Sequence, residues 1–398
     1  MKRAILLVVT LLSLVALSVF PARGQDGAIV LKTKGIQNQF LNGLLFEVTA
    51  ETKAPAKITE IKLEMAIKGN PRSSYTFLEF EPGTSVRGTY LLRTGGAQYK
   101  PPGILIEYRY VITDSEERTL ETEKETFLYM DNRFQWEKVS AGQMEVYYYG
   151  PALERAQLIL NIGTATVARM GALLGTTLSQ PIRIIAYNNA DDMSSALPFV
   201  SQAARTELLT QGIAFYDYDV LLVLAGDPQV DGVTSHEVTH MMFREATKGV
   251  LTELPEWLNE GMSEYANVNP NSSYDIFVAQ AVEANKLFRL RQLQVKPGIP
   301  SETMLFYGQA RAVVKFLVST YGEDKIKELF AAFRKGQQID AALKQVYGLD
   351  QDGLDNAWRK SIGLQPWGPV TATPPPSFTP EKAPNRTSRW TFGCAPAR

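Results

Sequence analysis

The chain has 398 residues, of which 45% are hydrophobic and 21% are charged, and its formal net charge is −1. This composition is typical of folded globular protein, and the length indicates two or three domains. A charge balance so close to zero gives no electrostatic basis for binding nucleic acid or an anionic membrane surface. The single cysteine, Cys394, excludes an intrachain disulfide, a paired-cysteine redox motif and a cysteine-rich metal site.

The N-terminus has the features of an export signal. Lys2 and Arg3 form a short basic region, and residues 4–20 are almost entirely apolar. Residues 21–24 then break the helix and provide small side chains at the spacing of a cleavage site, so Gln25 is the expected first residue of the mature chain. An uncleaved N-terminal membrane anchor is the alternative. Since no later segment is judged long and apolar enough to span a bilayer, we expect a secreted or extracytoplasmic protein, at the cell surface or in the periplasm.

Residues 25–133 are expected to form an all-β sandwich of immunoglobulin-like type. Short runs of alternating polar and apolar residues, without a helical period, are separated by turn-forming pairs such as Asn42-Gly43 and Gly95-Gly96. Several strands at this spacing are typical of a sandwich of two antiparallel sheets. No constellation of catalytic residue types falls in this region. We therefore interpret it as an accessory domain, with a spacer, a lid or a surface-binding module as functional alternatives.

A second domain is expected over residues 134–365, where helices and strands alternate. Pro151 is at a favourable position for the first turn of a long helix, which Gly175 can end. Residues 181–187 and 219–225 are apolar runs typical of buried strands. This alternation, leading into the motif described next, predicts an α+β domain that is mostly helical.

Both histidines of the chain lie in one segment, residues 235–240 (Ser-His-Glu-Val-Thr-His). His236 and His240 are four residues apart, so on a helix they share one face about one turn apart. Two imidazoles in this arrangement can bind one ion, while Glu237 is turned about 100° round the axis toward a water on that ion. The H-E-x-x-H pattern therefore predicts one zinc ion per chain, with Glu237 as the general base.

A second helical segment, residues 254–266 (Leu-Pro-Glu-Trp-Leu-Asn-Glu-Gly-Met-Ser-Glu-Tyr-Ala), carries a stripe of carboxylates. Glu256, Glu260 and Glu264 are spaced at i, i+4 and i+8. Like charges at this spacing cost a few tenths of a kcal/mol per pair on an isolated helix, and a neighbouring cation reverses the sign of that cost. By itself the stripe is typical of a solvated acidic face. Its position shortly after a two-histidine site indicates a metal ligand instead.

The number of ligands that zinc needs limits the choice of the third ligand. A catalytic zinc ion usually has three protein ligands and one open position for water. Because the chain has no third histidine and no suitable cysteine, the third ligand must be an aspartate or a glutamate. Glu260 is the preferred choice, with Glu253 and Glu256 as rivals. Glu264, one turn after Glu260, can accept a hydrogen bond from the free nitrogen of a ligating imidazole and so fix its tautomer.

The two motifs HEVTH and WLNEGMSEYA together resemble the gluzincin zinc metallopeptidases, in which a second helix supplies a glutamate as third ligand. These motifs are similar to those of aminopeptidase N-type enzymes and closer to those of the secreted bacterial peptidase MA-like domains. The resemblance covers residues 136–364. It implies a gluzincin-type metallopeptidase domain in which His236, His240 and Glu260 bind zinc. It also implies that Glu237 is both the base and the proton shuttle.

The sequence departs from the aminopeptidase pattern at two points. The spacing from His240 to Glu260 is one residue longer, and the Gly-x-Met-Glu-Asn element that those enzymes use at the substrate amine is absent. The metzincin continuation is absent too, because Phe243 and Ala246 fill positions where it needs glycine and histidine. We therefore expect an endopeptidase rather than an aminopeptidase.

The oxyanion that forms during peptide hydrolysis needs a donor besides zinc. Both histidines are used as ligands, and the family places a tyrosine in the helix region around Tyr307, so Tyr307 is the expected donor. The alternative is that Tyr307 is an ordinary, partly buried tyrosine. The later helices are interpreted as scaffold, and from residue 366 the composition changes to a proline-rich tail that we expect to be disordered.

Four segments are thus expected: a signal peptide (1–24), the sandwich (25–133), the peptidase domain (134–365) and the tail (366–398). The expected function is that of a secreted zinc metallopeptidase, a hydrolase acting on peptides or proteins. The alternative is an extracytoplasmic binding or cell-wall-associated protein that keeps zinc for stability. An intact Glu237 favours the first, because a structural zinc site has no need of a general base. Neither a nucleic-acid partner nor, after signal cleavage, a membrane span is expected.

Overall fold

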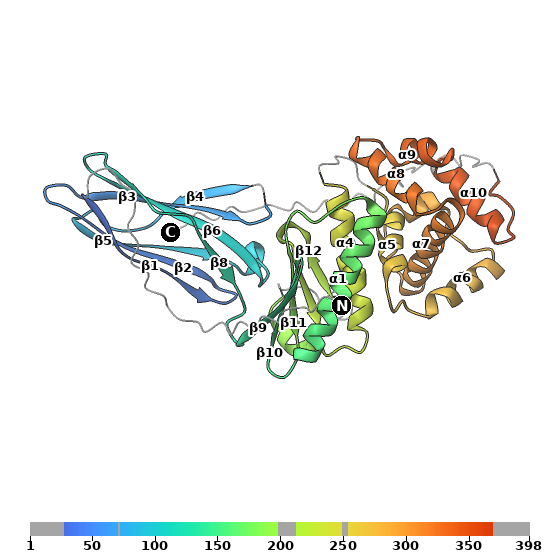
Figure 1. Cartoon of the computed structure of the whole chain (residues 1–398), viewed down its shortest axis with the longest axis horizontal. Helices are drawn as coiled ribbons and strands as arrows, with labels where there is room; N and C mark the ends of the chain where they lie inside the picture. The colour runs from blue at the N-terminus through green and yellow to red at the C-terminus, as the bar shows by residue number, and fades with distance from the viewer. Residues whose placement is uncertain (1–27, 71, 198–211, 249–253, 369–398) are drawn as a thin grey trace, which may run out of the picture.

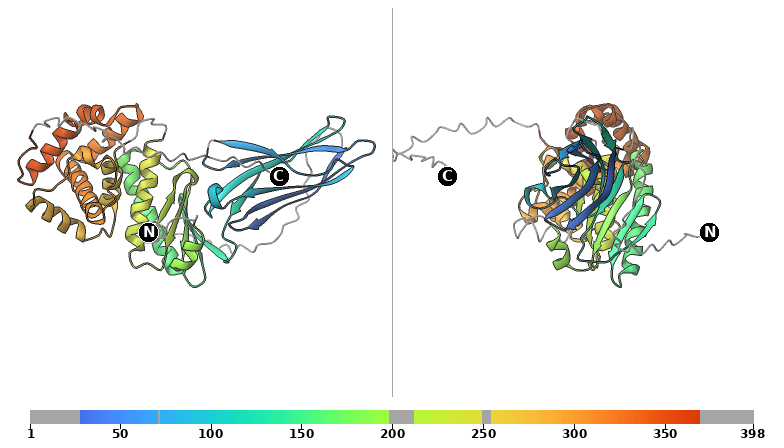
Figure 2. Two further views of the ribbon diagram at one scale, coloured as in Figure 1. Left: turned by 180° about the vertical axis from the view of Figure 1, so that it is seen from behind. Right: turned by 90° about the vertical axis from the view of Figure 1, so that its left-hand side faces the viewer.

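The computed structural model describes residues 28–70, 72–197, 212–248 and 254–368. The predicted signal peptide, the rival ligand Glu253 and most of the proline-rich tail lie outside these residues. The described chain is elongated, and its three parts follow one another along the long axis: a β-sandwich, a mixed sheet and a helical body (Figure 1). The view from behind shows the same order, with the mixed sheet between the sandwich and the helices (Figure 2).

Two antiparallel sheets form the N-terminal sandwich, as expected for a β-rich first region. Alternate residues of β2, among them Leu44, Phe46 and Val48, are fully buried between the sheets. The first sheet has the order β1-β2-β5, with β1 at Ile29–Gln39, β2 at Gly43–Thr52 and β5 at Ser85–Arg93. The second has the order β4-β3-β6-β7, with β3 at Ile58–Ile67, β4 at Ser73–Phe77, β6 at Ile104–Asp114 and β7 at Thr119–Glu121, and β8 (Glu125–Tyr129) also pairs with β6.

A five-stranded mixed sheet follows, in the order β12-β13-β11-β10-β9. Its three central strands are parallel, and the two edge strands are antiparallel to them. All six residues of β11 are buried, which is typical of a strand in a sheet covered on both faces. The strands are β9 (Trp136–Ala141), β10 (Met144–Tyr149), β11 (Ile182–Tyr187), β12 (Ile213–Phe215) and β13 (Val220–Leu224).

Two helices, α1 (Leu153–Leu174) and α4 (Val230–Ala246), cover one face of this sheet (Figure 1). Helix α1 buries Ile159, Leu160 and Met170 in the core of the domain. Among the described residues, α1 is also the helix whose length and hydropathy meet the requirement for a membrane span. This corrects the expectation that no segment after the signal is long and apolar enough.

The other face of the sheet is covered by the end of the sandwich, so the two domains share one apolar core. Ile104 and Tyr129 of the sandwich belong to the same buried cluster as Ile185, Tyr187 and Val220 of the sheet. Since strands buried on both faces need a cover on each side, the sandwich supplies the cover that helices provide on the opposite face.

A buried arginine crosses this interface. Arg183, on β11, is only 2% exposed. Its Nε donates to the carbonyl oxygen of Gly103 in the sandwich at 2.6 Å, and its Nη2 donates to that of Tyr218 at 2.7 Å. One guanidinium therefore satisfies two main-chain acceptors that belong to different domains.

The chain segment between the domains is held by Asp131, whose side chain is fully buried. Its carboxylate accepts from Arg133 Nε at 2.9 Å and from the Tyr187 hydroxyl at 3.1 Å. Its main-chain oxygen accepts from Trp136 Nε1 at 2.6 Å. Because one aspartate ties both sides of the junction to the sheet, the connection is a packed corner and not an extended linker.

The C-terminal part is helical, and α5 and α7 pack closely within it. Gly261 of α5 makes this possible, because a Cβ there would lie only 2.6 Å from the carbonyl oxygen of Ala310. The helices are α5 (Glu256–Ala266), α6 (Ser273–Glu283), α7 (Pro300–Tyr321), α8 (Glu323–Arg334), α9 (Ile339–Tyr347) and α10 (Gln351–Ser361). The short helix η3 (Leu290–Gln294) belongs to the same part. Short helices elsewhere in the described chain are η1 (Gly96–Gln98) in the sandwich, and α2 (Ala190–Ser195) and η2 (Tyr216–Tyr218) beside the mixed sheet.

The packed chain continues slightly beyond the expected start of the tail. Trp367 donates from Nε1 to Asp355 Oδ2 at 2.8 Å, and the Arg359 guanidinium lies 3.7 Å from the centre of its ring. A cation over an indole face is a favourable contact, so these residues anchor the chain to α10 before the tail begins.

Replacing Arg183 by methionine is predicted to lower the free energy of unfolding by about 2–4 kcal/mol, because one buried and one partly buried carbonyl oxygen lose a charged donor. Chemical denaturation of the mature protein measures this value. Arg155→Met, at an exposed position on α1, is the matched control and should change stability by less than about 0.5 kcal/mol. Equal stability of the two variants would contradict the role of Arg183 at the interface.

Candidate metal centre

Helices α4 and α5 bring the three predicted ligands together. His236 and His240 lie one turn apart on α4, and their Nε2 atoms are 3.0 Å from each other. Glu260, on α5, places Oε2 3.4 Å from His236 Nε2 and 3.3 Å from His240 Nε2. These are histidine and carboxylate atoms that can share one metal ion.

The size of this triangle suits zinc. Zinc binds histidine nitrogen and carboxylate oxygen at about 2.0–2.2 Å, so tetrahedral ligand atoms are about 3.3–3.6 Å apart. Two of the three observed separations fall in that interval, and the third is shorter by a few tenths of an ångström. Three ligands also leave a fourth position open, as in catalytic rather than structural sites.

Both imidazoles are held in the tautomer that a metal requires. His236 Nδ1 lies 2.9 Å from Glu264 Oε1, which is the contact expected from the sequence. His240 Nδ1 lies 2.8 Å from Asn259 Oδ1 and 3.0 Å from Ser263 Oγ, two partners that the sequence did not suggest. Because each Nδ1 faces an oxygen acceptor, each carries the ring proton, and both Nε2 lone pairs point toward the centre of the triangle.

The centre of the triangle is built for a cation. Two imidazole lone pairs and one carboxylate oxygen converge there at 3.0–3.4 Å. Glu260 Oε2 is buried and makes no hydrogen bond, which is a costly state for an acceptor unless a metal ion satisfies it. The donor set, the distances and the orphaned oxygen therefore fit a bound zinc ion.

Electrostatics within the site lead to the same conclusion. Burial lowers the pKa of His236, but the carboxylates of Glu260 and Glu264 outweigh it and raise that pKa well above its usual value. The pKa of His240 is raised as well, because Glu260 outweighs the effect of burial. Burial raises the pKa of Glu260, yet the two imidazoles hold it well below its usual range. The carboxylates thus stabilise positive charge at the point where the three side chains meet.

Glu237 occupies the position expected for a general base. It is 8% exposed and lies on α4 between the two histidines. Burial raises the pKa of its carboxyl, and the neighbouring imidazoles act in the opposite direction. A carboxylate with a raised pKa beside a metal-bound water is better able to take and return a proton near neutral pH.

Two tyrosines flank the site, one beside each histidine. The ring of Tyr307, the predicted oxyanion donor on α7, is 6.4 Å from the His236 ring, and its hydroxyl accepts from Lys296 Nζ at 3.3 Å. The ring of Tyr216, on η2, is 6.4 Å from the His240 ring. Burial, with Glu237 and other carboxylates nearby, raises the pKa of Tyr216. The structure therefore offers a second phenol near the site, which the sequence did not reveal.

The rival third ligands have different outcomes. Glu256 is not among the described groups that converge with the two histidines, and its carboxylate interacts with Asn259 instead. Glu253 lies outside the described residues. Of the glutamates that the structure describes on α5, Glu260 faces the imidazole Nε2 atoms and Glu264 faces the back of His236.

Two histidines from one helix, a glutamate from the next and a buried glutamate beside the first histidine define the site class of the zinc metallopeptidases. The family profile of the Peptidase MA superfamily matches residues 162–363, just over half of the chain, and the chain belongs to this superfamily. This confirms the predicted relation to gluzincin-like peptidases. Among solved structures the chain is similar to an M1 zinc metallopeptidase from Deinococcus radiodurans, with 12% identity, a TM-score of 0.33 and coverage of 86% of this chain and 96% of that chain. The comparison with curated proteins finds no match.

Glu260→Ala is predicted to weaken zinc binding by more than about 100-fold, because the loss of a direct ligand should exceed the 10–100-fold cost typical of a supporting residue. Zinc content after dialysis against a chelator, measured by mass spectrometry, tests this. Glu256→Ala removes the same charge from the same helix and should keep one zinc ion per chain. Full zinc retention by Glu260→Ala would remove it from the ligand set.

Glu264→Ala is predicted to weaken zinc binding by about 10–100-fold, since His236 loses the acceptor that orients its ring. Glu264→Gln keeps an acceptor oxygen and should lose less. A competition titration with a chromophoric zinc chelator gives both affinities. Equal losses in the two variants would show that charge, which both of them lose, and not ring orientation, is the contribution of Glu264.

Proposed function

We propose that this protein is a zinc-dependent metallopeptidase that hydrolyses peptide bonds. The observation that carries the proposal is the convergence of His236, His240 and Glu260 on one point, with Glu237 buried beside it. A metal kept only for stability needs the three ligands but has no use for a buried carboxylate next to the open position.

The residues of the chain divide the work of hydrolysis between them. A bound zinc ion would supply a lowered water pKa and a polarised substrate carbonyl. Glu237 accepts the proton of the attacking water and returns it to the leaving amine nitrogen. Tyr307 and Tyr216 each bring a phenol near one of the histidines, and the charge that develops on the carbonyl oxygen requires such a donor.

Within this class we propose an endopeptidase. The support is the absence of the Gly-x-Met-Glu-Asn element from the sequence, because aminopeptidases of similar sequence use it to bind the free amine of the substrate. A peptidase that does not fix a substrate terminus accepts chain on both sides of the scissile bond. The substrates proposed are therefore internal peptide bonds of peptides or proteins.

We also propose that the protein acts outside the cytoplasm and that its sandwich is immunoglobulin-like. Residues 1–24 support the first point by their basic start, apolar run and small residues near the end. The strand order supports the second, since the first, second and fifth strands form one sheet and the third, fourth and sixth belong to the other. Greek-key sandwiches divide their strands between two sheets in a similar way.

Glu237→Gln is predicted to keep zinc at one ion per chain and to lower kcat/KM by about 100–10,000-fold, because the amide cannot take a proton from water. The assay follows hydrolysis of a quenched fluorescent peptide library by the mature, zinc-loaded protein. Glu245→Gln, the same change on the same helix outside the site, should leave hydrolysis unchanged.

The proposal fails if the wild-type protein binds zinc stoichiometrically and yet hydrolyses no peptide above the level of Glu237→Gln. In that case the protein belongs to the second class, in which a zinc-stabilised domain serves binding. Zinc content distinguishes this result from a misloaded preparation, so each activity is measured on protein of known metal content.

A further inference from the structure

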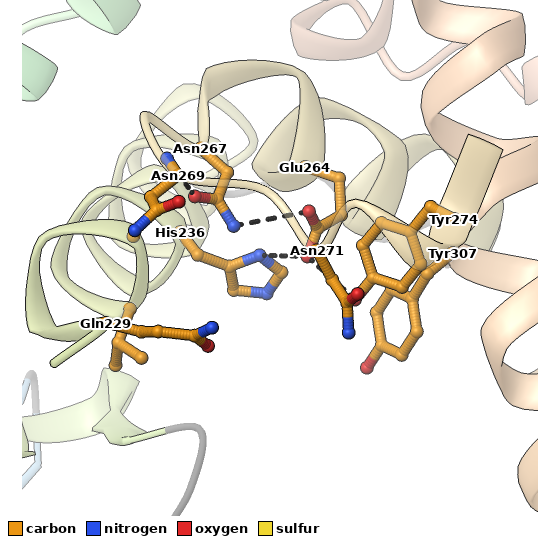
Figure 3. A pocket seen from close by; sticks show the side chains of 10 residues that line it. Gln229, His236, Glu264, Asn267, Asn269, Asn271, Tyr274 and Tyr307 are labelled. Atoms are coloured by element: carbon orange, nitrogen blue, oxygen red, sulfur yellow. Dashed lines mark hydrogen bonds and ion pairs between the residues drawn. The ribbon is translucent and has the colours of Figure 1, made fainter. Parts of the chain in front are cut away.

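A cavity of about 220 Å³ adjoins the metal centre on the side of His236. One wall is the first part of α4, and the opposite wall comes from the end of α5, the loop after it and the starts of α6 and α7 (Figure 3). Tyr307 and His236 both line the cavity, so a substrate side chain next to the scissile bond can enter it. Its lining differs from the apolar pockets that most ligand sites present.

Carboxamides are the most frequent polar groups in the lining of this cavity. Gln229, Asn267, Asn269 and Asn271 all contribute to it. The charged carboxylate in the lining, Glu264, is already occupied by His236 Nδ1 at 2.9 Å and by Asn267 Nδ2 at 3.2 Å. The carboxylate of Glu264 is thus directed at two donors of the protein itself, and the other polar side chains of the lining are uncharged.

The asparagine wall is fixed before any ligand arrives. Asn269 Nδ2 donates to Asp231 Oδ1 at 3.3 Å, and Asn269 N donates to Asn267 Oδ1 at 2.9 Å, so the loop is tied both to α4 and to itself. Gly232 on α4 allows this close approach, because a Cβ there would lie 2.9 Å from both Asn267 Oδ1 and the Asn269 carbonyl oxygen. A preformed wall loses less entropy when a ligand binds.

Two amides are directed across the cavity toward the same space. Asn271 Oδ1 accepts from Ser273 N at 2.9 Å, which turns its Nδ2 donor away from α6. Figure 3 shows this amide nitrogen and the amide end of Gln229 pointing into the cavity from opposite walls, below the His236 ring. One wall thus offers a donor, and the other offers both a donor and an acceptor.

We propose that this cavity is a substrate subsite for an asparagine or glutamine side chain next to the scissile bond, an inference that rests on the proposed peptidase function. A carboxamide has one acceptor and two donors, so it can pair with Gln229 and accept from Asn271 at the same time. An apolar side chain of the same size would strip water from both amides and return no hydrogen bond.

The test compares matched peptides that differ at one residue, glutamine or methionine, which are close in size. A library randomised on both sides of the scissile bond first identifies the substrate position whose side chain binds in the cavity. At that position the wild-type, zinc-loaded protein should prefer glutamine to methionine by about threefold in kcat/KM, near the lower end of the net effect of one hydrogen bond, because Gln229 and Asn271 are exposed to solvent. Asn271→Leu and Gln229→Leu should each reduce that ratio to about one.

Asn161→Leu, an exposed change on α1, is the matched control and should leave the ratio unchanged. Gln229→Glu adds a negative charge to the cavity and should create a preference for lysine over glutamine. Equal kcat/KM for glutamine and methionine peptides with the wild type, or an unchanged ratio in both leucine variants, would overturn the proposal. The second leucine variant keeps the test valid if the first fails to fold.

Binding measurements separate this proposal from the proposed activity. Zinc-loaded Glu237→Gln protein and fluorescein-labelled forms of the same peptides give affinities by fluorescence anisotropy without turnover. If the wild type cleaves no peptide, the peptidase assignment fails. The ratio of the affinities for the glutamine and methionine peptides then still decides whether the cavity prefers a carboxamide side chain. If the wild type cleaves peptides but both ratios equal one, the activity stands and the subsite is rejected.

Discussion

The structure depends on the meeting of three electron-rich atoms at one point. Two imidazole nitrogens and a carboxylate oxygen face each other at 3.0–3.4 Å, an arrangement that is repulsive without a cation between them. Helices α4 and α5 must hold these atoms against that repulsion. They do so through contacts on the far side of each ligand, where Glu264, Asn259 and Ser263 fix the two rings.

The supports of the site form an ordered stripe on α5. Asn259 and Ser263 contact His240, Glu264 contacts His236, and Glu260 faces the Nε2 atoms of both. Asn259 and Ser263 are four residues apart, as are Glu260 and Glu264. Side chains four apart lie one above the other on a helix, so one helix presents two parallel rows to the two histidines. The close packing of α5 on α7 through Gly261 fixes the helix that carries both rows.

The sequence was most informative where residues recur at the period of a helix. The four-residue spacing of the two histidines predicted that they share one face of a helix, because helix geometry determines which side chains lie one above the other. The same spacing on α5 fitted Glu256 as well as Glu260 and Glu264, and the choice of Glu260 came from the resemblance to the gluzincin peptidases. Tyr216 could not be found this way, since it comes from a short element after an edge strand and nothing local links it to α4. Lys296 reaches Tyr307 from a loop, and loops carry no period.

The β-rich N-terminal region and the buried strands were also predictable, because alternation and apolar runs report how a strand is covered. The pattern does not say what covers it. The run of β11, which is apolar apart from Arg183 and Tyr187, is equally compatible with helices on both faces, and nothing in it indicates the sandwich as the second cover. The asparagines that line the cavity carry no sequence signal for the same reason, because the cavity also depends on the residues of α4 opposite them.

The shared core between the sandwich and the sheet has a consequence for what counts as a unit of this protein. Ile185 and Val220 have their packing partners in the N-terminal domain, and Arg183 has one of its two acceptors there. Without the sandwich, this face of the sheet would expose its apolar side chains to water, and Arg183 would lose the carbonyl oxygen of Gly103 while keeping that of Tyr218. The sandwich therefore forms one wall of the core of the second domain, and we expect the two domains to unfold together.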